Sequence, residues 1–276
     1  MTEKEIKNRI KSISDTVKIT KAMQMLASTK IYQSEAKQKS AKDYYLEVEK
    51  SVLRLINSKD GNTPLFKEGS GASSIVVVGA EKGLCGDYNH QVFKLADNVI
   101  DGFSLRGKIY SVGYVAREYY RSKNIHTDTC FISVFSSPTP FDARRMAEEL
   151  MKTYLESDLK EILIVYTDQS ENGWVAKSER LLPIELEPNQ EESQARILGE
   201  KDVTSILKEY LTARIYRMLT TAVNAVNYKR MMAMKQSTIN GEEMVEDLTL
   251  QYNRTRQNKI TDELNDATSV IFGKKV

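Results

Sequence analysis

The sequence has 276 residues, of which 41% are hydrophobic and 28% are charged, and its formal net charge is +2. This apolar content excludes a disordered polyelectrolyte, and the near-neutral balance gives no general attraction to nucleic acid. The two cysteines and two histidines form no CxxC pair and no usual zinc spacing, so we expect neither a disulfide framework nor a metal site. No run approaches the roughly 18 apolar residues that span a bilayer, so we expect no transmembrane segment.

Residues 1–60 carry a coiled-coil pattern. Mostly apolar or small side chains recur there in alternating steps of four and three, which is the a/d spacing of a heptad repeat. These positions are Ile6, Ile10, Ile13, Val17, Thr20, Gln24, Ala27, Ile31, Ser34, Gln38, Ala41, Tyr45, Val48, Val52 and Leu55. No Gly or Pro precedes Gly61, so the pattern predicts one helix about 75 Å long, at about 1.5 Å per residue. A helix of this length needs a partner along most of its length.

The middle of the chain, residues 70–188, alternates between strand and helix patterns. Short β-branched or alternating runs predict strands, and amphipathic runs between them predict helices. The predicted strands are Ile75–Val78, Lys108–Val112, Ile162–Tyr166 and Val175–Leu182, and the predicted helices are His90–Ile100, Tyr114–Lys123 and Arg144–Leu155. Such alternation is typical of a small, Rossmann-like α/β domain with a largely parallel sheet.

The helical period returns after a polar segment, Glu185 to Gly199, that we interpret as a loop. From Lys201 onward an apolar seam is resumed, and no proline follows Pro188. Its expected members are Ile206, Leu207, Tyr210, Leu211, Met218, Ala222, Ala225 and Met232, and later Ile260, Leu264, Ala267 and Ile271. Gly241 lies between the two groups and would weaken the helix by about 1 kcal/mol. We predict one long helix with a weaker middle.

The expected fold class is therefore α/β with a long antiparallel coiled coil of the N- and C-terminal helices. Residues 1–60 and 200–276 would form the two coiled-coil helices, and residues 70–188 would be an α/β domain inserted between them. In the alternative arrangement, each terminal helix packs on the α/β domain as an ordinary amphipathic helix.

Three motifs bear on function. The first is KITKAMQMLASTK, residues 18–30; the second is GLCGDYN, residues 83–89; the third is RMMAMKQSTINGEEMVEDLTLQYNRTRQNKITDEL, residues 230–264. In this order and at this spacing they resemble the signatures of the gamma subunits of F-type, rotary ATP synthases. The resemblance covers both ends of the chain and the turn after the first predicted strand.

The resemblance implies a central rotor shaft that transmits torque between an ion-driven membrane ring and a catalytic hexamer. The expected partners are the alpha and beta subunits of that hexamer, the epsilon subunit and the membrane c-ring. The shaft itself would be non-catalytic and hold no cofactor, because ATP, ADP and magnesium would belong to the partner subunits. Its expected location is peripheral, at the cytoplasmic face of a bacterial cell membrane. The coupling ion, proton or sodium, and the direction of ATP turnover stay open.

Two segments are candidate partner contacts. Around Thr20 and Gln24 the a/d positions have little apolar bulk, so this part of the helix would pack only weakly on its partner helix. Its methionine and lysine side chains therefore remain available to an outside surface. The resemblance implies that this stretch lies inside the hexamer and touches its subunits. Its expected contact residues are Thr20, Lys21, Met23 and Gln24.

The second segment is a polar block, Asn253, Arg254, Arg256 and Gln257, in a register where apolar residues are expected. Arginine and glutamine there could bond carboxylates and amides of a surrounding collar. The resemblance implies that Arg256 and Gln257 contact a catch loop of the catalytic subunits, and we include Arg254 with them. For both segments the alternative is a solvated helix surface.

The glycine turn at residues 83–89 follows a strand and precedes a helix, as phosphate-binding loops do. It lacks both the GxGxxG spacing and the GK[ST] ending, so we interpret it as a tight turn with Cys85 as a small buried side chain. Two functional alternatives remain: a free-standing α/β enzyme with helical dimerisation arms, and a coiled-coil adaptor. The first would need a convergent set of acid, base or phosphate-binding residues.

Overall fold

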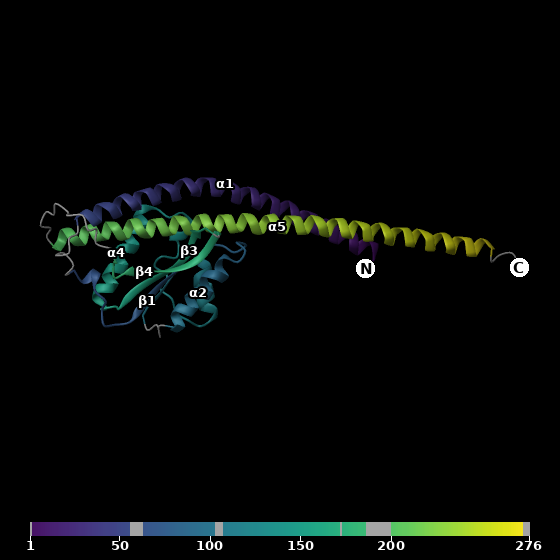
Figure 1. Ribbon diagram of the computed structural model, residues 1–276. Coiled ribbons are helices and arrows are strands. Elements are labelled where there is room, and N and C mark those ends of the chain that lie inside the picture. Colours follow the sequence, from purple (N-terminus) through teal and green to yellow (C-terminus); the bar gives the residue numbers. More distant parts are fainter. Residues whose placement is uncertain (1, 56–62, 103–106, 172, 186–199, 273–276) are drawn as a thin grey trace. The chain divides into compact units, whose positions relative to one another are not determined.

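The computed structural model describes residues 2–55, 63–102, 107–171, 173–185 and 200–272 (Figure 1). Its helices and strands follow in the order α1 (Glu3–Leu55), β1 (Ser73–Val78), α2 (Tyr88–Gly102), β2 (Ile109–Val112), α3 (Tyr114–Ser122), α4 (Pro140–Glu156), β3 (Glu161–Ser170), β4 (Gly173–Leu182) and α5 (Glu200–Phe272). Short 3-10 helices cover Pro64–Phe66 and Val134–Ser136. Every strand and helix predicted from the sequence has a counterpart here. The predicted loop lies outside the described residues except for Glu185.

Contacts within the chain group its residues into two compact units. Unit 1 comprises residues 1–27 with 231–276, and unit 2 comprises residues 28–230. The three-part division drawn from the sequence stays a prediction.

Unit 2 contains a four-stranded sheet in the order β2-β1-β3-β4. β1 pairs in parallel with β2 and β3, whereas β4 runs antiparallel to β3. All residues of β1 are buried, which explains its continuous β-branched sequence, because a central parallel strand has both faces covered. The largely parallel sheet expected from the sequence is thus confirmed, with β4 as its antiparallel edge strand.

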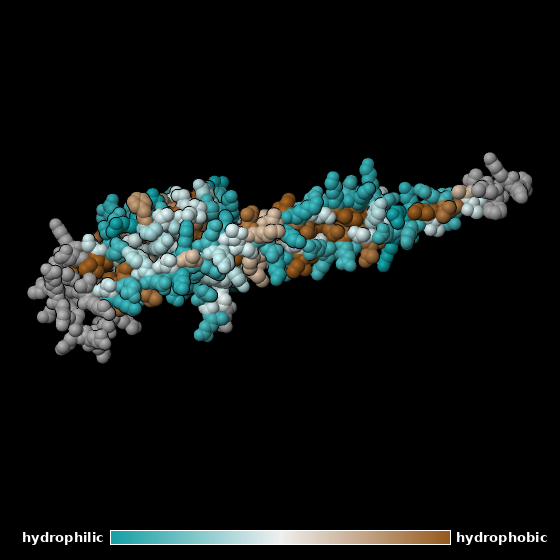
Figure 2. Space-filling view, turned by 90° about the horizontal axis from the view of Figure 1, so that it is seen from above, coloured by the Kyte–Doolittle hydropathy of each residue, from teal (hydrophilic) through white to brown (hydrophobic). Residues whose placement is uncertain are grey.

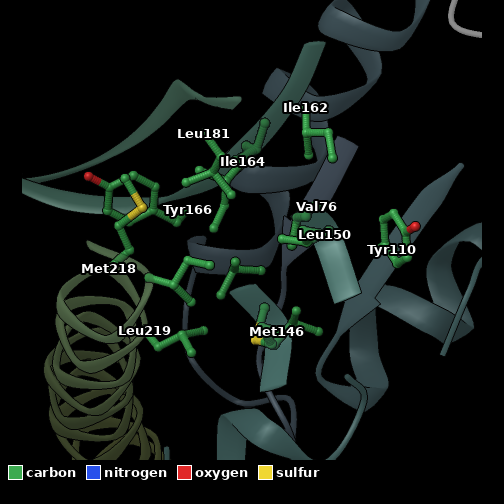
Figure 3. Close-up of a cluster of buried hydrophobic side chains, with 14 of the residues drawn as sticks. Val76, Tyr110, Met146, Leu150, Ile162, Ile164, Tyr166, Leu181, Met218 and Leu219 are labelled. Atoms are coloured by element: carbon green, nitrogen blue, oxygen red, sulfur yellow. The ribbon is translucent and has the colours of Figure 1, made fainter. Parts of the chain in front are cut away.

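The hydrophobic core of unit 2 includes side chains of α5 as well as those of the α/β layer. Figure 3 shows Met218 and Leu219 of α5 beside Met146 and Leu150 of α4, next to strand residues such as Ile164. All five are completely buried. The first half of α5 is therefore part of the α/β core. Burial of each such side chain contributes about 1.5–3 kcal/mol to the stability of the fold.

α1 and α5 also pair with each other in an antiparallel sense in unit 2. Ser34 bonds Asn224, Gln38 contacts Thr221, and farther along the hydroxyls of Tyr45 and Tyr210 lie 3.4 Å apart. Residue numbers rise along α1 as they fall along α5. In this unit α5 therefore packs both on α1 and on the α/β layer, so each of the two arrangements expected from the sequence describes one side of this helix.

Unit 1 is built from the other halves of the same two helices. The hydroxyls of Thr20 and Thr238 lie 2.8 Å apart, and Tyr252 donates a hydrogen bond to Glu3 at 3.1 Å. This pairing is antiparallel as well. Every a/d position predicted for α1 whose side chain is described is buried or half-buried, which confirms the heptad register of the N-terminal helix.

The predicted seam of α5 is wrong in its second half. Met232, Ile260, Leu264 and Ala267 are exposed, Ile260 and Leu264 by 47% and 62%, and the side chain of Ile271 lies outside the described part. The residues that face α1 in unit 1 follow a different phase. They are Met234, Thr238, Gly241, Val245, Leu248, Tyr252 and Thr255. Tyr252 and Lys259 of α5 both contact Glu3, the first residue of α1, so the pairing extends to this level of α5.

The polar block falls outside this seam. Asn253, Arg254, Arg256 and Gln257 are exposed, while their half-buried neighbours Tyr252 and Thr255 occupy the seam positions. The sequence-based register placed the block where apolar residues were expected. The residues of α5 that face α1 include the small or polar Thr238, Gly241 and Thr255, so a search for apolar positions did not find the correct heptad register.

One helix start was also predicted too late. α4 begins at Pro140 instead of Arg144 because Thr139 and Asp142 form a capping box. The Thr139 hydroxyl accepts the backbone N–H of Asp142 at 3.2 Å, and the Asp142 carboxylate accepts that of Thr139 at 3.1 Å. Two otherwise unpaired backbone donors are thereby satisfied.

Gly241 allows the two helices of unit 1 to approach closely. A Cβ atom at this position would lie 2.5 Å from Cγ2 of Val17. Alanine would favour the helix by about 1 kcal/mol, but overpacking costs about 1–3 kcal/mol. We predict that Gly241→Ala lowers the free energy of unfolding by up to about 2 kcal/mol, measured by chemical denaturation.

Gly102→Ala is the matched control, because nothing lies within 4 Å of a Cβ there. Val17→Ala in the Gly241→Ala background should recover part of the loss. A stabilised Gly241→Ala variant would contradict the close contact.

Candidate partner-contact surface

The predicted contact residues of α1 divide between the seam and the surface. Thr20 is half-buried; its hydroxyl meets Thr238 across the seam and also bonds the Val17 carbonyl at 3.0 Å. Gln24 and Met23 are half-buried, whereas Lys21 is exposed. Lys21 is thus the member of the set whose side chain is most available to a partner.

The sequence analysis missed apolar side chains on the outer side of the same segment. Ile19 and Leu26 are 60% and 64% exposed and are seven residues apart, so they share one helix face. Met25, beside them, is also exposed, as the sequence analysis expected for methionine side chains of this segment. Figure 2 shows hydrophobic residues (brown) among hydrophilic ones on the helical part of the molecule. The sequence itself could have indicated this surface, because Ile19, Met25 and Leu26 are apolar residues that do not fall on the a/d positions of the heptad repeat.

Arg254, Arg256 and Gln257 lie near the point where α1 begins. All three are exposed, and the neighbouring Lys259 ammonium is 4.0 Å from the Glu3 carboxylate. Thr20 lies opposite Thr238, about 24 Å along α5 from Arg254 at about 1.5 Å per residue. The two predicted contact segments therefore form two separate sites on the helix pair.

The glycine turn of unit 2 is a compact strand-to-helix connection. Leu84 and Gly86 have φ angles of 60° and 59°, a left-handed conformation that is uncommon for a leucine. Asn89 accepts the backbone N–H of Ala80 at 2.9 Å and donates to the Cys85 sulfur at 3.2 Å. Cys85 is buried, as expected, and burial raises the pKa of its thiol. A thiol of this kind is a poor nucleophile at neutral pH.

The turn is attached to α5 at the start of the third sequence motif. Arg230 donates to the carbonyl of Lys82 at 3.1 Å, and the Lys229 ammonium is 2.9 Å from the Asp87 carboxylate. Leu84, between these anchors, is exposed. The second motif and the beginning of the third motif are thus parts of one local structure.

A mostly buried cluster of charged groups joins α5 to β3 and β4. Arg217 of α5 lies 3.8 Å from Asp168 and from Glu179, and it donates to the Tyr166 hydroxyl at 3.4 Å. Arg214 adds a contact of 3.2 Å to Glu179. The Arg217 guanidinium also lies over the ring of Tyr45 of α1, 5.1 Å from its centroid. The sequence analysis missed this cluster, because its members are far apart in the chain.

Glu179 stays ionised in this cluster despite its burial. Burial by itself would raise the pKa of the carboxyl group, but hydrogen bonds from Lys177 and Tyr166, and the charges of Lys177 and Arg217, outweigh that effect. The pKa falls to about 2. The arrangement holds α5 on β3 and β4.

Neither a metal-ligand group nor a membrane-spanning helix was found within the described ranges. Within that part of the chain, His, Cys, Asp and Glu side chains do not gather in threes as a metal ion would require. Among the same residues, no helix combines the length and the apolarity needed to cross a bilayer.

Comparison with known proteins gives a match over nearly the whole chain. A family model described as ATP synthase matches residues 2–270. The chain is 32% identical to the ATP synthase gamma chain of Ruminiclostridium cellulolyticum, with 95% of each chain covered. It is 31% identical to that of Caldanaerobacter subterraneus subsp. tengcongensis, with both chains covered completely.

The fold is also similar to that of solved structures. A chain in the Euglena gracilis mitochondrial ATP synthase, from an OSCP/F1/c-ring structure, matches with a TM-score of 0.67 at 13% identity, covering 99% of this chain and 96% of that one. A chain from the central stalk and c-ring structure of the Tetrahymena thermophila mitochondrial ATP synthase matches with a TM-score of 0.58 at 16% identity. That match covers 79% of this chain and 98% of the other.

The charged cluster predicts how stability depends on pH. A carboxyl group whose pKa is lower in the folded state stabilises the fold above its unfolded pKa, and the stabilisation is lost as pH falls through the folded pKa. We predict that part of the unfolding free energy is lost between about pH 4.5 and about pH 2 because Glu179 becomes protonated. Glu179→Gln should cost about 1–3 kcal/mol at pH 7.

The variant should also lose less stability than the parent over that acidic range, as measured by denaturant unfolding at several pH values. Glu156→Gln, at an exposed position, is the matched control and should leave the profile unchanged. Identical profiles for Glu179→Gln and the parent would show that Glu179 does not stabilise the fold.

Proposed function

The chain belongs to the ATP synthase gamma-chain family, and from this premise we propose that it is the central rotor shaft of an F-type ATP synthase. It would transmit torque between an ion-driven membrane ring and the catalytic alpha/beta hexamer, for ATP synthesis or for ATP-driven ion pumping. The full-length match to gamma chains carries this proposal. The paired terminal helices support it, since a shaft needs an elongated element that resists bending and twisting.

The shaft would act through shape and contact, with no chemistry of its own. An asymmetric helix pair inside a pseudo-threefold collar presents a different face to each catalytic subunit. Its rotation would favour one conformation after another at each site, which is a population shift driven by unequal contacts. Nucleotide and magnesium would be held by the partner subunits, so this chain would be a non-catalytic subunit.

The proposed partners are the alpha and beta subunits, the epsilon subunit and the c-ring. The chain would be held peripherally at the cytoplasmic face of a bacterial membrane through these partners. On α1 the proposed contacts are Lys21 and Met23, with Ile19 and Leu26 added because they are exposed and apolar. Thr20 and Gln24 are half-buried between α1 and α5, so they would act mainly by limiting the apolar packing between the two helices at this level.

Rotation and nucleotide binding test this function directly. Phe141 is exposed at the start of α4, so Phe141→Cys offers an attachment point for a bead. With the hexamer immobilised, ATP should turn the bead in one direction, with three pauses per turn. The isolated chain should neither hydrolyse ATP nor bind it tightly by calorimetry. Stoichiometric micromolar binding of ATP to the isolated chain would contradict the proposal.

The contacts near the end of the helix pair give a separate prediction. Arg256 and Gln257 are exposed, so replacing both with alanine should change stability by no more than about 0.5 kcal/mol for each residue. If both residues bond a collar that moves past them, each charge-assisted contact is worth about 1.5–3 kcal/mol. We expect Arg256→Ala with Gln257→Ala to leave helicity, melting and assembly nearly intact and to lower turnover of the assembled motor several-fold.

The matched control is Arg121→Ala with Ser122→Ala on the exposed end of α3, which should leave turnover unchanged. Unchanged turnover in the Arg256/Gln257 variant would mean that the pair is only solvated. Loss of the folded chain would mean that the pair is structural.

A further inference from the structure

Unit 2 contains a connected group of polar side chains between α1 and α5. This polar layer consists of Ser34 and Gln38 from α1 and Thr221 and Asn224 from α5. Ser34 donates to the Asn224 side-chain oxygen at 2.8 Å, and the Asn224 amide donates to the Gln38 oxygen at 2.6 Å. The Gln38 amide reaches the Thr221 hydroxyl at 3.5 Å. Ser34, Thr221 and Asn224 are buried, and Gln38 is half-buried.

The two sides of α5 are held in different ways at this level. Toward the α/β layer, Met218, Leu219 and Ala222 are completely buried within the hydrophobic core. Toward α1, the contacts recorded at Thr221 and Asn224 are hydrogen bonds. Apolar packing is non-directional and tolerates small displacements, whereas hydrogen bonds depend on distance and angle. At Thr221 and Asn224 the interface with α1 therefore has a geometric requirement that the apolar contacts of Met218, Leu219 and Ala222 do not have.

A shift of α1 along α5 would separate the partners of these hydrogen bonds. If α1 moved by one heptad in one direction, Ala41 and Tyr45 would take the places of Ser34 and Gln38 beside Asn224. If it moved the other way, Ile31 would replace Gln38. In neither case would an amide face Asn224. Its buried polar atoms would then lose their partners, which is unfavourable because they would also be shielded from water.

We propose that the polar layer is a register lock, which holds α1 at one axial and rotational position against α5. It selects the native alignment by penalising the shifted ones, as single buried polar residues do in coiled coils. Because the network is complete, it costs less than isolated buried amides would. The lock contributes more to uniqueness of alignment than to stability.

The test separates alignment from stability in the full-length chain. Spin labels at Lys39→Cys and Ser205→Cys report the separation of the two helices, since both positions are exposed. Cys130 is exposed and is replaced by serine, while Cys85 is buried and is retained. One heptad of slip changes the axial separation by about 10 Å, at about 1.5 Å per residue. The parent should give a single narrow distance distribution.

The apolar variant combines Ser34→Ala, Gln38→Leu, Thr221→Val and Asn224→Leu. Its melting temperature should equal or exceed that of the parent, because apolar groups replace every member of the network. Its distance distribution should nevertheless broaden and include displaced separations. Val48→Ile, an apolar exchange at another α1 seam position, is the matched control and should keep the distribution narrow.

Asn224→Ala tests the same idea without relying on the fourfold variant. It removes the residue that connects Ser34 to Gln38, so it should lower the melting temperature and also broaden the distribution. A distribution as narrow as that of the parent, in either Asn224→Ala or a folded fourfold variant, would overturn the proposal. It would mean that the remaining contacts of α1 set the register without the polar layer.

Discussion

The structure of unit 2 depends on the burial of the first half of α5 on two sides. Between Val203 and Asn227 most residues of this helix are buried, and the rest are half-buried except for Ser205. A surface helix would show one apolar stripe and one polar face, whereas a helix covered on several sides loses this contrast. Leu207, Leu211 and Met218 are completely buried. The α/β layer and α1 both pack on this helix, so without it both would expose side chains that are now buried.

The two covered sides of α5 have different chemistry. Toward the sheet the helix combines apolar side chains with the Arg217 cluster, in which a mostly buried guanidinium faces the carboxylates of Asp168 and Glu179. Removing one partner of such a cluster leaves a buried charge uncompensated, so the helix is held firmly in place. Toward α1 the contacts include the polar layer, in which hydrogen bonds specify alignment. A shaft that transmits torque needs both properties, since a loose helix would absorb the twist and a misaligned one would present the wrong residues.

The elements whose burial pattern is continuous along one segment were the ones that the sequence predicted best. The heptads of α1 and the β-branched run of β1 each carry their own signal, and both predictions were confirmed. The second half of the α5 seam was misplaced because Thr238, Gly241 and Thr255 are small or polar residues that a search for apolar positions passes over. The start of α4 was missed because capping by Thr139 and Asp142 extends the helix beyond its amphipathic part.

The candidate surface was predictable to a smaller extent, because exposure depends on tertiary packing. Thr20 and Lys21 are adjacent in the sequence, yet one meets Thr238 in the seam and the other is exposed. The Arg217 cluster brings together α1, β3, β4 and α5, so residue spacing within any single segment could not reveal it. The family resemblance gave a reason to select Arg256 and Gln257, and the structure adds that both are exposed.

The last part of α5 shows why the proposed shaft would need its collar. From Arg256 to Thr268 every side chain is exposed, including Ile260 and Leu264. In proteins most helical stability comes from tertiary packing rather than from intrinsic propensity. Burying leucine or isoleucine from water yields about 1.5–3 kcal/mol per side chain, so an apolar surround would stabilise this segment and bind it at the same time. In the proposed assembly the catalytic hexamer would supply that surround, and Arg256 and Gln257 would lie where the packed helix pair gives way to the single helix.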